Sequence, residues 1–144
     1  ERTIFLEAFQ PNPDHTTVGL LTLGGVFGEG VDLVDDRLIG VAIVGVGLPQ
    51  VGLDNDSIRE YYDNKGSNGF DYAYRFPGMN KVTQAVGRLI RTPTDRGSAL
   101  LIDDRYTQGE YRDVFGRLWP DAQIVLSPQE VRSSLLSFYK EKQK

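Results

Sequence analysis

Apolar residues in this chain recur with two different periods, one typical of helices and one typical of buried strands. Apolar side chains three and four positions apart predict amphipathic helices over residues 2–9, 56–63, 110–118 and 128–140. Short continuous runs of aliphatic residues predict strands over residues 18–23, 39–46, 98–102 and 123–126. Strands of this kind, alternating with helices, indicate an α/β fold in which helices cover both faces of a mainly parallel sheet.

The most informative pattern covers residues 78–91, which we predict to form one helix that ends before Pro93. Its apolar positions share one side: Met79, Val82, Val86 and Leu89. Its polar positions share the other side: Lys81, Gln84, Arg88 and Arg91. Two arginines one turn apart offer a fork of donors that suits a polyphosphate. The alternative is a solvated helix face that carries ordinary arginines.

A glycine-rich turn follows the first predicted strand, with glycines at Gly25, Gly28 and Gly30. The phosphate loop of NTPases has a different spacing, since it needs glycine, four residues, glycine, lysine and then serine or threonine. The carboxylates of Glu29 and Asp32 would also repel a pyrophosphate. They suit sugar hydroxyls, a cationic partner or a neighbouring arginine. Glycines that merely permit a tight strand exit are the alternative.

A pair of carboxylates, Asp103 and Asp104, follows the predicted strand 98–102, at the edge of a parallel sheet where ligands bind. Such a pair could hold a metal ion. Because the chain has no phosphate loop that would bring nucleotide-bound magnesium to it, we favour a structural role. In that role the pair caps the backbone, or pairs with Arg105 or with the arginines of 78–91.

Composition and charge limit the classes of function that remain. The net charge of −4 provides no bulk attraction for nucleic acid, so such contact requires the local basic cluster between Arg75 and Arg105. The absence of cysteine excludes disulfides and thiolate sites, and His15 has no histidine or cysteine partner for a metal. The longest apolar run, 38–48, is shorter than the about 20 residues that span a bilayer. Because the first residue is Glu1, we expect a piece of a longer polypeptide, or a processed or separate chain.

Taken in order, the motifs resemble those of one family. The string Gly28-Glu29-Gly30-Val31-Asp32-Leu33 is similar to the fifth helicase motif. Gln84-Ala85-Val86-Gly87-Arg88-Leu89-Ile90-Arg91 is similar to the sixth, Gln-x-x-Gly-Arg-x-x-Arg. Residues 38–49, 79–82 and 100–106 are similar to the flanking sequence of the DinG/XPD branch of superfamily-two DNA helicases. The resemblance covers about Phe5 to Tyr106.

The resemblance implies a RecA-like three-layer domain over 1–144, most of the second motor domain of a two-domain helicase. ATP with Mg²⁺ would be shared with a first RecA-like motor domain, in the same chain or in trans, that carries the phosphate loop. An iron–sulfur cluster, where the family has one, would not lie in this segment. Single-stranded DNA would be the further partner, no membrane is implied, and the location would be cytoplasmic, or nuclear in a eukaryote.

The resemblance also implies roles for individual residues. Arg91, as arginine finger, and Arg88 would reach the γ-phosphate of ATP, and Gln84 would orient the site or the attacking water. The remaining expected ATP-binding residues are Gly30, Asp32 and Gly87. The expected nucleic-acid contacts are Gly28, Glu29, Lys81 and Arg75.

Two departures and two alternatives accompany this interpretation. The threonine or serine with which related helicases contact a nucleic-acid phosphate would fall near Gly24 or Gly25, and Gly28 stands where many members have serine. A non-catalytic RecA-like domain that binds an anionic partner, nucleic acid or protein, is the main alternative. An independent nucleotide-binding α/β enzyme is the other, and the missing phosphate loop argues against it.

Overall fold

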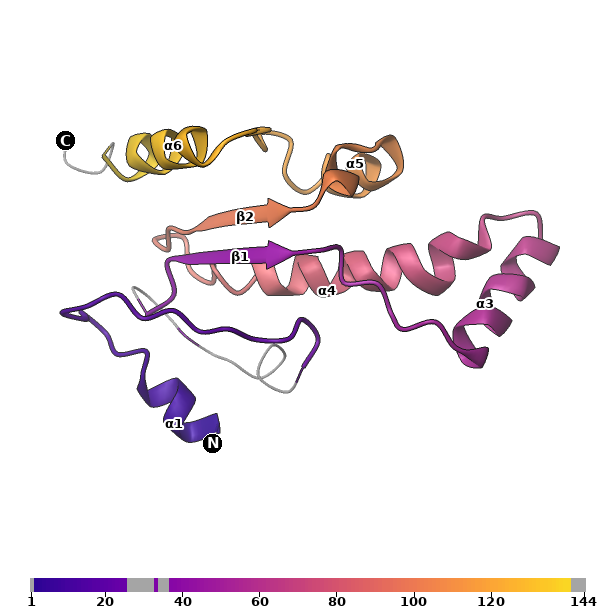
Figure 1. Cartoon of the computed structure of the whole chain (residues 1–144), viewed down its shortest axis with the longest axis horizontal. Coiled ribbons are helices and arrows are strands. Elements are labelled where there is room, and N and C mark those ends of the chain that lie inside the picture. Colours follow the sequence, from indigo (N-terminus) through magenta and orange to yellow (C-terminus); the bar gives the residue numbers. More distant parts are fainter. Residues whose placement is uncertain (1, 26–32, 34–36, 141–144) are drawn as a thin grey trace. The chain divides into compact units, whose positions relative to one another are not determined.

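The computed structural model describes residues 2–25, 33 and 37–140, and Figure 1 shows the course of the chain. These residues form two compact units, Glu1–Tyr106 and Thr107–Lys144, which are described separately below. A single domain over 1–144 stays a prediction. Within the described part of the chain, no helix is long and apolar enough to cross a membrane.

The first unit is built on two parallel strands, β1 (Gly40–Val44) and β2 (Ser98–Ile102). Gly40 pairs with Ser98 and Val44 pairs with Ile102, so both strands end at the same edge. Between them in sequence come α3 (Leu53–Asn64), a π-helical turn η2 (Asp71–Arg75) and α4 (Phe76–Val86). Helix α4 lies alongside β1, and the unit begins with α1 (Arg2–Glu7) (Figure 1). The predicted strands 39–46 and 98–102 and the predicted parallel pairing are confirmed.

The core of the first unit lies where β1 and its exit loop meet α4. Met79 and Val82 of α4 are completely buried, and Ile43 and Val46 are 6% and 1% exposed. Gly78 allows this close approach, because a Cβ there would lie 2.7 Å from the carbonyl oxygen of Val46. The predicted burial of both faces of the strands is only partly seen, since Val44 is 78% exposed in this unit.

Helix α3 and η2 pack against each other through polar and aromatic contacts. The Tyr74 hydroxyl donates a 2.8 Å hydrogen bond to Asp56, which raises the pKa of Tyr74. The rings of Tyr62 and Tyr72 stack with centroids 3.8 Å apart. The prediction of a helix at 56–63 is confirmed, and the helix is longer at both ends.

Two sequence predictions in the first unit are wrong. Residues 18–23 form no strand, and Val18 and Leu20 are 77% and 91% exposed. This segment lies against α1, where a Cβ on Gly19 would come within 2.7 Å of the Phe5 ring. The helix predicted to reach Arg91 ends at Val86, with Gly87 as its C-cap.

The second unit contains α5 (Gly109–Phe115) and α6 (Pro128–Lys140), both predicted. A short 3₁₀ turn, η3 (Asp104–Thr107), precedes them. The predicted strand 123–126 is wrong: Ile124 and Leu126 are 62% and 87% exposed. The Leu126 N–H donates to the Glu130 carboxylate rather than to a neighbouring strand. The predicted cap is confirmed, because Ser127 Oγ accepts the Glu130 N–H at 3.2 Å.

Candidate functional site

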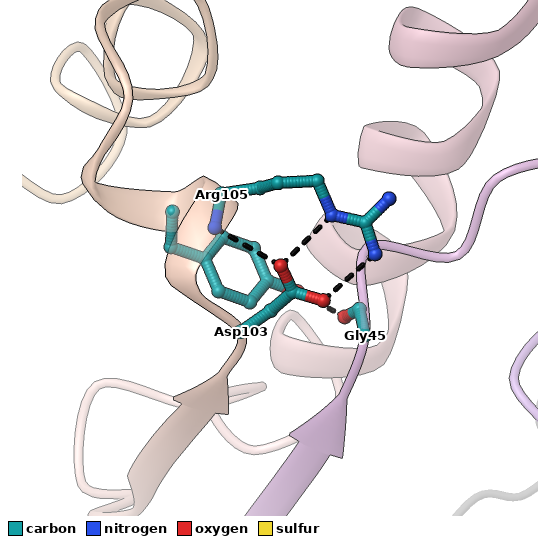
Figure 2. Close-up of polar contacts among 4 residues, drawn as sticks. Gly45, Asp103 and Arg105 are labelled. Carbon is teal, nitrogen blue, oxygen red and sulfur yellow. Dashed lines mark hydrogen bonds and ion pairs between the residues drawn. The ribbon is translucent and has the colours of Figure 1, made fainter.

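The shared edge of the two strands is closed by a polar clasp made of Asp103, Arg105, Tyr106 and Gly45 (Figure 2). Nε and Nη2 of Arg105 each donate to one oxygen of Asp103 at 2.8 Å, and the Arg105 N–H donates to Oδ1 at 3.0 Å. These bonds from Arg105 hold the pKa of the Asp103 carboxyl well below its usual range. The hydroxyl of Tyr106 donates to the Gly45 carbonyl at 2.6 Å and so joins the end of β2 to the end of β1.

The clasp shows which partner the Asp103 carboxylate has. Both of its oxygens accept hydrogen bonds from Arg105, so the predicted structural pairing is confirmed. No group of three or more histidine, cysteine, aspartate or glutamate side chains among the described residues is arranged to hold a metal ion.

The four polar residues of 78–91 do not share one helical stripe. Lys81 and Gln84 lie on α4, whereas Arg88 and Arg91 lie on the loop beyond it. The chain leaves the helix through tight turns, in which the N–H groups of Arg88 and Leu89 bond to carbonyls three residues earlier. Leu89 turns inward and is 4% exposed. Arg88 is half-buried and Arg91 is exposed at the surface of the loop.

The loop that carries Arg91 is closed by Asp95, a residue that the sequence interpretation did not single out. Asp95 Oδ2 accepts the N–H groups of Arg91 and Thr92 at 2.7 and 2.9 Å. Asp95 Oδ1 accepts the Thr92 hydroxyl at 2.6 Å. The hydrogen bonds, led by that from the Thr92 hydroxyl, lower the pKa of Asp95. The sequence contained a signal, because aspartate and threonine beside a proline commonly close turns through such bonds.

Lys81 lies beside the glycine turn that precedes the fifth motif. Gly24 has a φ of +76°, and a Cβ there would be 3.1 Å from Lys81 Cδ and 3.6 Å from its Nζ. The Gly25 N–H closes this turn with a 3.0 Å bond to the Thr22 carbonyl. Lys81 forms no ion pair within the part of the chain that the structure describes. Its half-buried stem therefore carries an ammonium to the glycine turn.

Arg75 is held inside the fold rather than presented at the surface. Its guanidinium pairs with Asp71 one turn earlier in η2, and the two side chains are only 12% and 19% exposed. The guanidinium also lies 5.6 Å from the centre of the Phe70 ring. This placement gives Arg75 an internal contact, and its expected DNA contact stays a prediction.

Four predicted site residues lie outside the described residues: Gly28, Glu29, Gly30 and Asp32. Their roles stay predictions. The same holds for the functional roles of Gln84, Gly87, Arg88 and Arg91, whose positions alone are given by the structure.

Comparison with known proteins connects this geometry to one family. The helicase C-terminal domain family matches residues 1–122. The chain is 30% identical over 127 residues to the ATP-dependent DNA helicase chl-1 of Caenorhabditis elegans, covering 78% of the chain and 15% of that relative. It is 31% identical over 112 residues to the ATP-dependent DNA helicase DinG of Photobacterium profundum, and this match covers 76% of the chain and 16% of that relative. The chain thus spans less than a fifth of these relatives.

A solved XPD helicase structure has a similar fold. The match has a TM-score of 0.50 at 22% identity and covers 66% of this chain and 18% of that one. The parallel strands and flanking helices therefore belong to a RecA-like α/β fold, as predicted. Together with the match over residues 1–122, this places the chain in the helicase C-terminal domain family, among helicases of the DinG/XPD type.

Proposed function

We propose that this chain is the C-terminal motor domain of an ATP-dependent DNA helicase, and that it supplies the arginine finger and part of the single-stranded DNA track. The observation that carries the proposal is the position of Arg91. The sixth motif leaves α4 at Gly87, and Arg91 follows on an exposed loop whose backbone is fixed by hydrogen bonds. An arginine that must reach a nucleotide bound mainly by another domain needs this placement.

In the proposed reaction Arg91 and Arg88 contact the γ-phosphate of ATP. As charge develops on the transferred phosphoryl group, a guanidinium offers paired donors and a fixed positive charge. Gln84, exposed on the last turn of α4, orients the site or the attacking water. The phosphate loop and the ligands of Mg²⁺ come from the first RecA-like motor domain, with Gly30, Asp32 and Gly87 completing the ATP site from this side.

The proposed DNA contact is made by Lys81 at the Gly24–Gly25 turn. The threonine or serine that related helicases carry in the fifth motif would fall near Gly24 or Gly25, neither of which has a hydroxyl, and the positive φ of Gly24 disfavours a side chain there. The ammonium of Lys81 lies beside the same turn and provides the positive charge that a backbone phosphate requires. A contact to phosphate rather than to bases suits a motor that must accept any sequence. Gly28 and Glu29 are the further proposed contacts with the single-stranded DNA.

The isolated chain tests the proposal when it is compared with the same chain joined to its first motor domain. DNA-stimulated ATP hydrolysis should require both parts, because this chain has no phosphate loop. Substantial turnover by the isolated chain would contradict the shared site. Calorimetry of the isolated chain with ATP, single-stranded DNA and a polyanion separates the proposal from a non-catalytic domain, which would prefer the polyanion to both others.

A further inference from the structure

We propose that Asp95 is a positioning residue for Arg91, acting through the loop backbone and not through ATP. The inference rests on the proposed function, since it matters only if Arg91 contacts the nucleotide. Asp95 lies outside both helicase motifs, at the end of the segment Thr92-Pro93-Thr94-Asp95 that follows Arg91.

The geometry at Asp95 fixes two consecutive peptide planes. One carboxylate oxygen accepts the N–H of Arg91 at 2.7 Å and the N–H of Thr92 at 2.9 Å. These two bonds orient the peptide units on either side of the Arg91 Cα, and hence the direction in which its side chain leaves the backbone. The second oxygen accepts the Thr92 hydroxyl at 2.6 Å, which stops the carboxylate from rotating away. A charged acceptor makes all three bonds stronger than neutral ones.

The other side of the loop is fixed by packing. Leu89, two residues before Arg91, is 4% exposed. A Cβ on Gly97 would lie 2.9 Å from Leu89 Cδ2, so the returning chain runs directly over this side chain. The next residue, Ser98, begins β2 and donates its N–H to the Ile39 carbonyl at 3.0 Å. The loop is therefore attached to the core at Leu89 and to the sheet at Ser98.

Between these two attachments, Asp95 accepts the backbone N–H groups of Arg91 and Thr92 and so helps to set the direction in which the Arg91 side chain leaves the backbone. An uncharged methyl at position 95 would leave the N–H groups of Arg91 and Thr92 to water. Arg91 would then sample several directions, and catalysis is sensitive to such errors because a displacement of about 1 Å can cost roughly 100-fold in rate.

The experiment measures steady-state ATP hydrolysis at saturating single-stranded DNA in the full-length helicase that contains this chain. We expect Asp95→Ala to lower kcat about 10- to 100-fold and to change the KM for ATP less than about 3-fold. Asp95→Asn keeps one acceptor oxygen, so its kcat should fall less, by about 3- to 10-fold. Asp113→Ala is the matched control, because this exposed aspartate of α5 forms no ion pair with another described residue, and the kcat of the variant should stay within about 2-fold of the wild-type value.

A double-mutant cycle separates positioning from a general structural role. In an Arg91→Ala background, Asp95→Ala should cause almost no further loss of kcat, because the group that it positions is gone. Additive losses would overturn the inference, as would full kcat in Asp95→Ala. If Arg91→Ala itself left kcat unchanged, the proposed function would fail instead. Should Asp95→Ala not fold, Asp95→Asn and Thr92→Val, each in the same cycle, decide the outcome.

Discussion

Helix α4 and the loop that follows it carry one sequence motif, yet different forces hold them in place. The helix is fixed by burial, with Met79 and Val82 completely enclosed against β1 and its exit loop. In the loop Leu89 is deeply buried, and hydrogen bonds to Asp95 are among the contacts that hold the backbone. Stability therefore resides in the helix, whereas the loop provides an exposed and defined position for Arg91.

The difference has a local cause at Gly87. Glycine is about 1 kcal/mol less favourable than alanine inside a helix, so it weakens continuation beyond Val86. Leu89 nevertheless stays buried beyond the end of the helix, because it turns inward and packs beside Gly97. A motif whose spacing is helical can thus be half helix and half loop.

The largest expected effect on stability comes from the helix. Met79→Ala removes a completely buried side chain and should lower the free energy of unfolding by about 2–5 kcal/mol, as measured by urea denaturation. The neighbouring exposed position, in the variant Asn80→Ala, is the control and should change it by less than about 0.5 kcal/mol. Equal effects of the two variants would contradict the assignment of stability to the buried face of α4.

A smaller effect is expected at the clasp that joins the two strand ends. Asp103→Asn weakens the bonds from Arg105. It should lower the free energy of unfolding at pH 7 by about 1–2 kcal/mol, a value that allows for the partial exposure of Arg105. Because folding lowers the pKa of Asp103, its contribution is fully present above the ordinary pKa of aspartate, about 3.9, and is lost as the pH falls through the folded value. The difference between wild type and variant should therefore shrink in acid. A difference in the free energy of unfolding that grew in acid would contradict the stabilising role of the ionised Asp103 carboxylate.

The smallest stability effect is expected at Lys81, which should matter for DNA binding instead. Lys81→Ala should change the free energy of unfolding by less than about 0.5 kcal/mol. The salt dependence of single-stranded DNA binding by the full-length protein should fall by about one unit of slope, as for one lost phosphate contact. Lys65→Ala, at an exposed lysine beyond α3, should leave that slope unchanged and serves as control. Identical slopes for the two variants would remove Lys81 from the proposed DNA track.

Much of the fold followed from hydrophobic pattern. The strands β1 and β2 and helix α3 were predictable from their residue pattern, and α6 also from its serine cap. The strands predicted at 18–23 and 123–126 do not form, since β-branched residues favour a strand only where a neighbouring strand accepts the backbone bonds. In the second of these segments the Leu126 N–H bonds to the Glu130 carboxylate instead.

The residue types of the candidate site could be read from the sequence, and their roles stay predictions. Lys81 and Arg91 were identified from motif and charge, but the helical spacing of apolar residues continues past Gly87, so it did not show where α4 ends. Arg75 shows a similar limit, because the basic cluster that begins with it gave no sign of its ion pair with Asp71, one turn earlier. Asp95 was missed because its hydrogen bonds are made chiefly to backbone N–H groups, which a motif of side chains does not display.

The most direct measurement of the central claim is kcat for DNA-stimulated ATP hydrolysis by the full-length protein carrying Arg91→Ala. Removal of an arginine finger is worth roughly 10³–10⁵ in rate, so we expect a loss of at least about 100-fold with the fold intact by circular dichroism. A loss smaller than about 100-fold would contradict the account and would make Arg91 a structural residue of the loop.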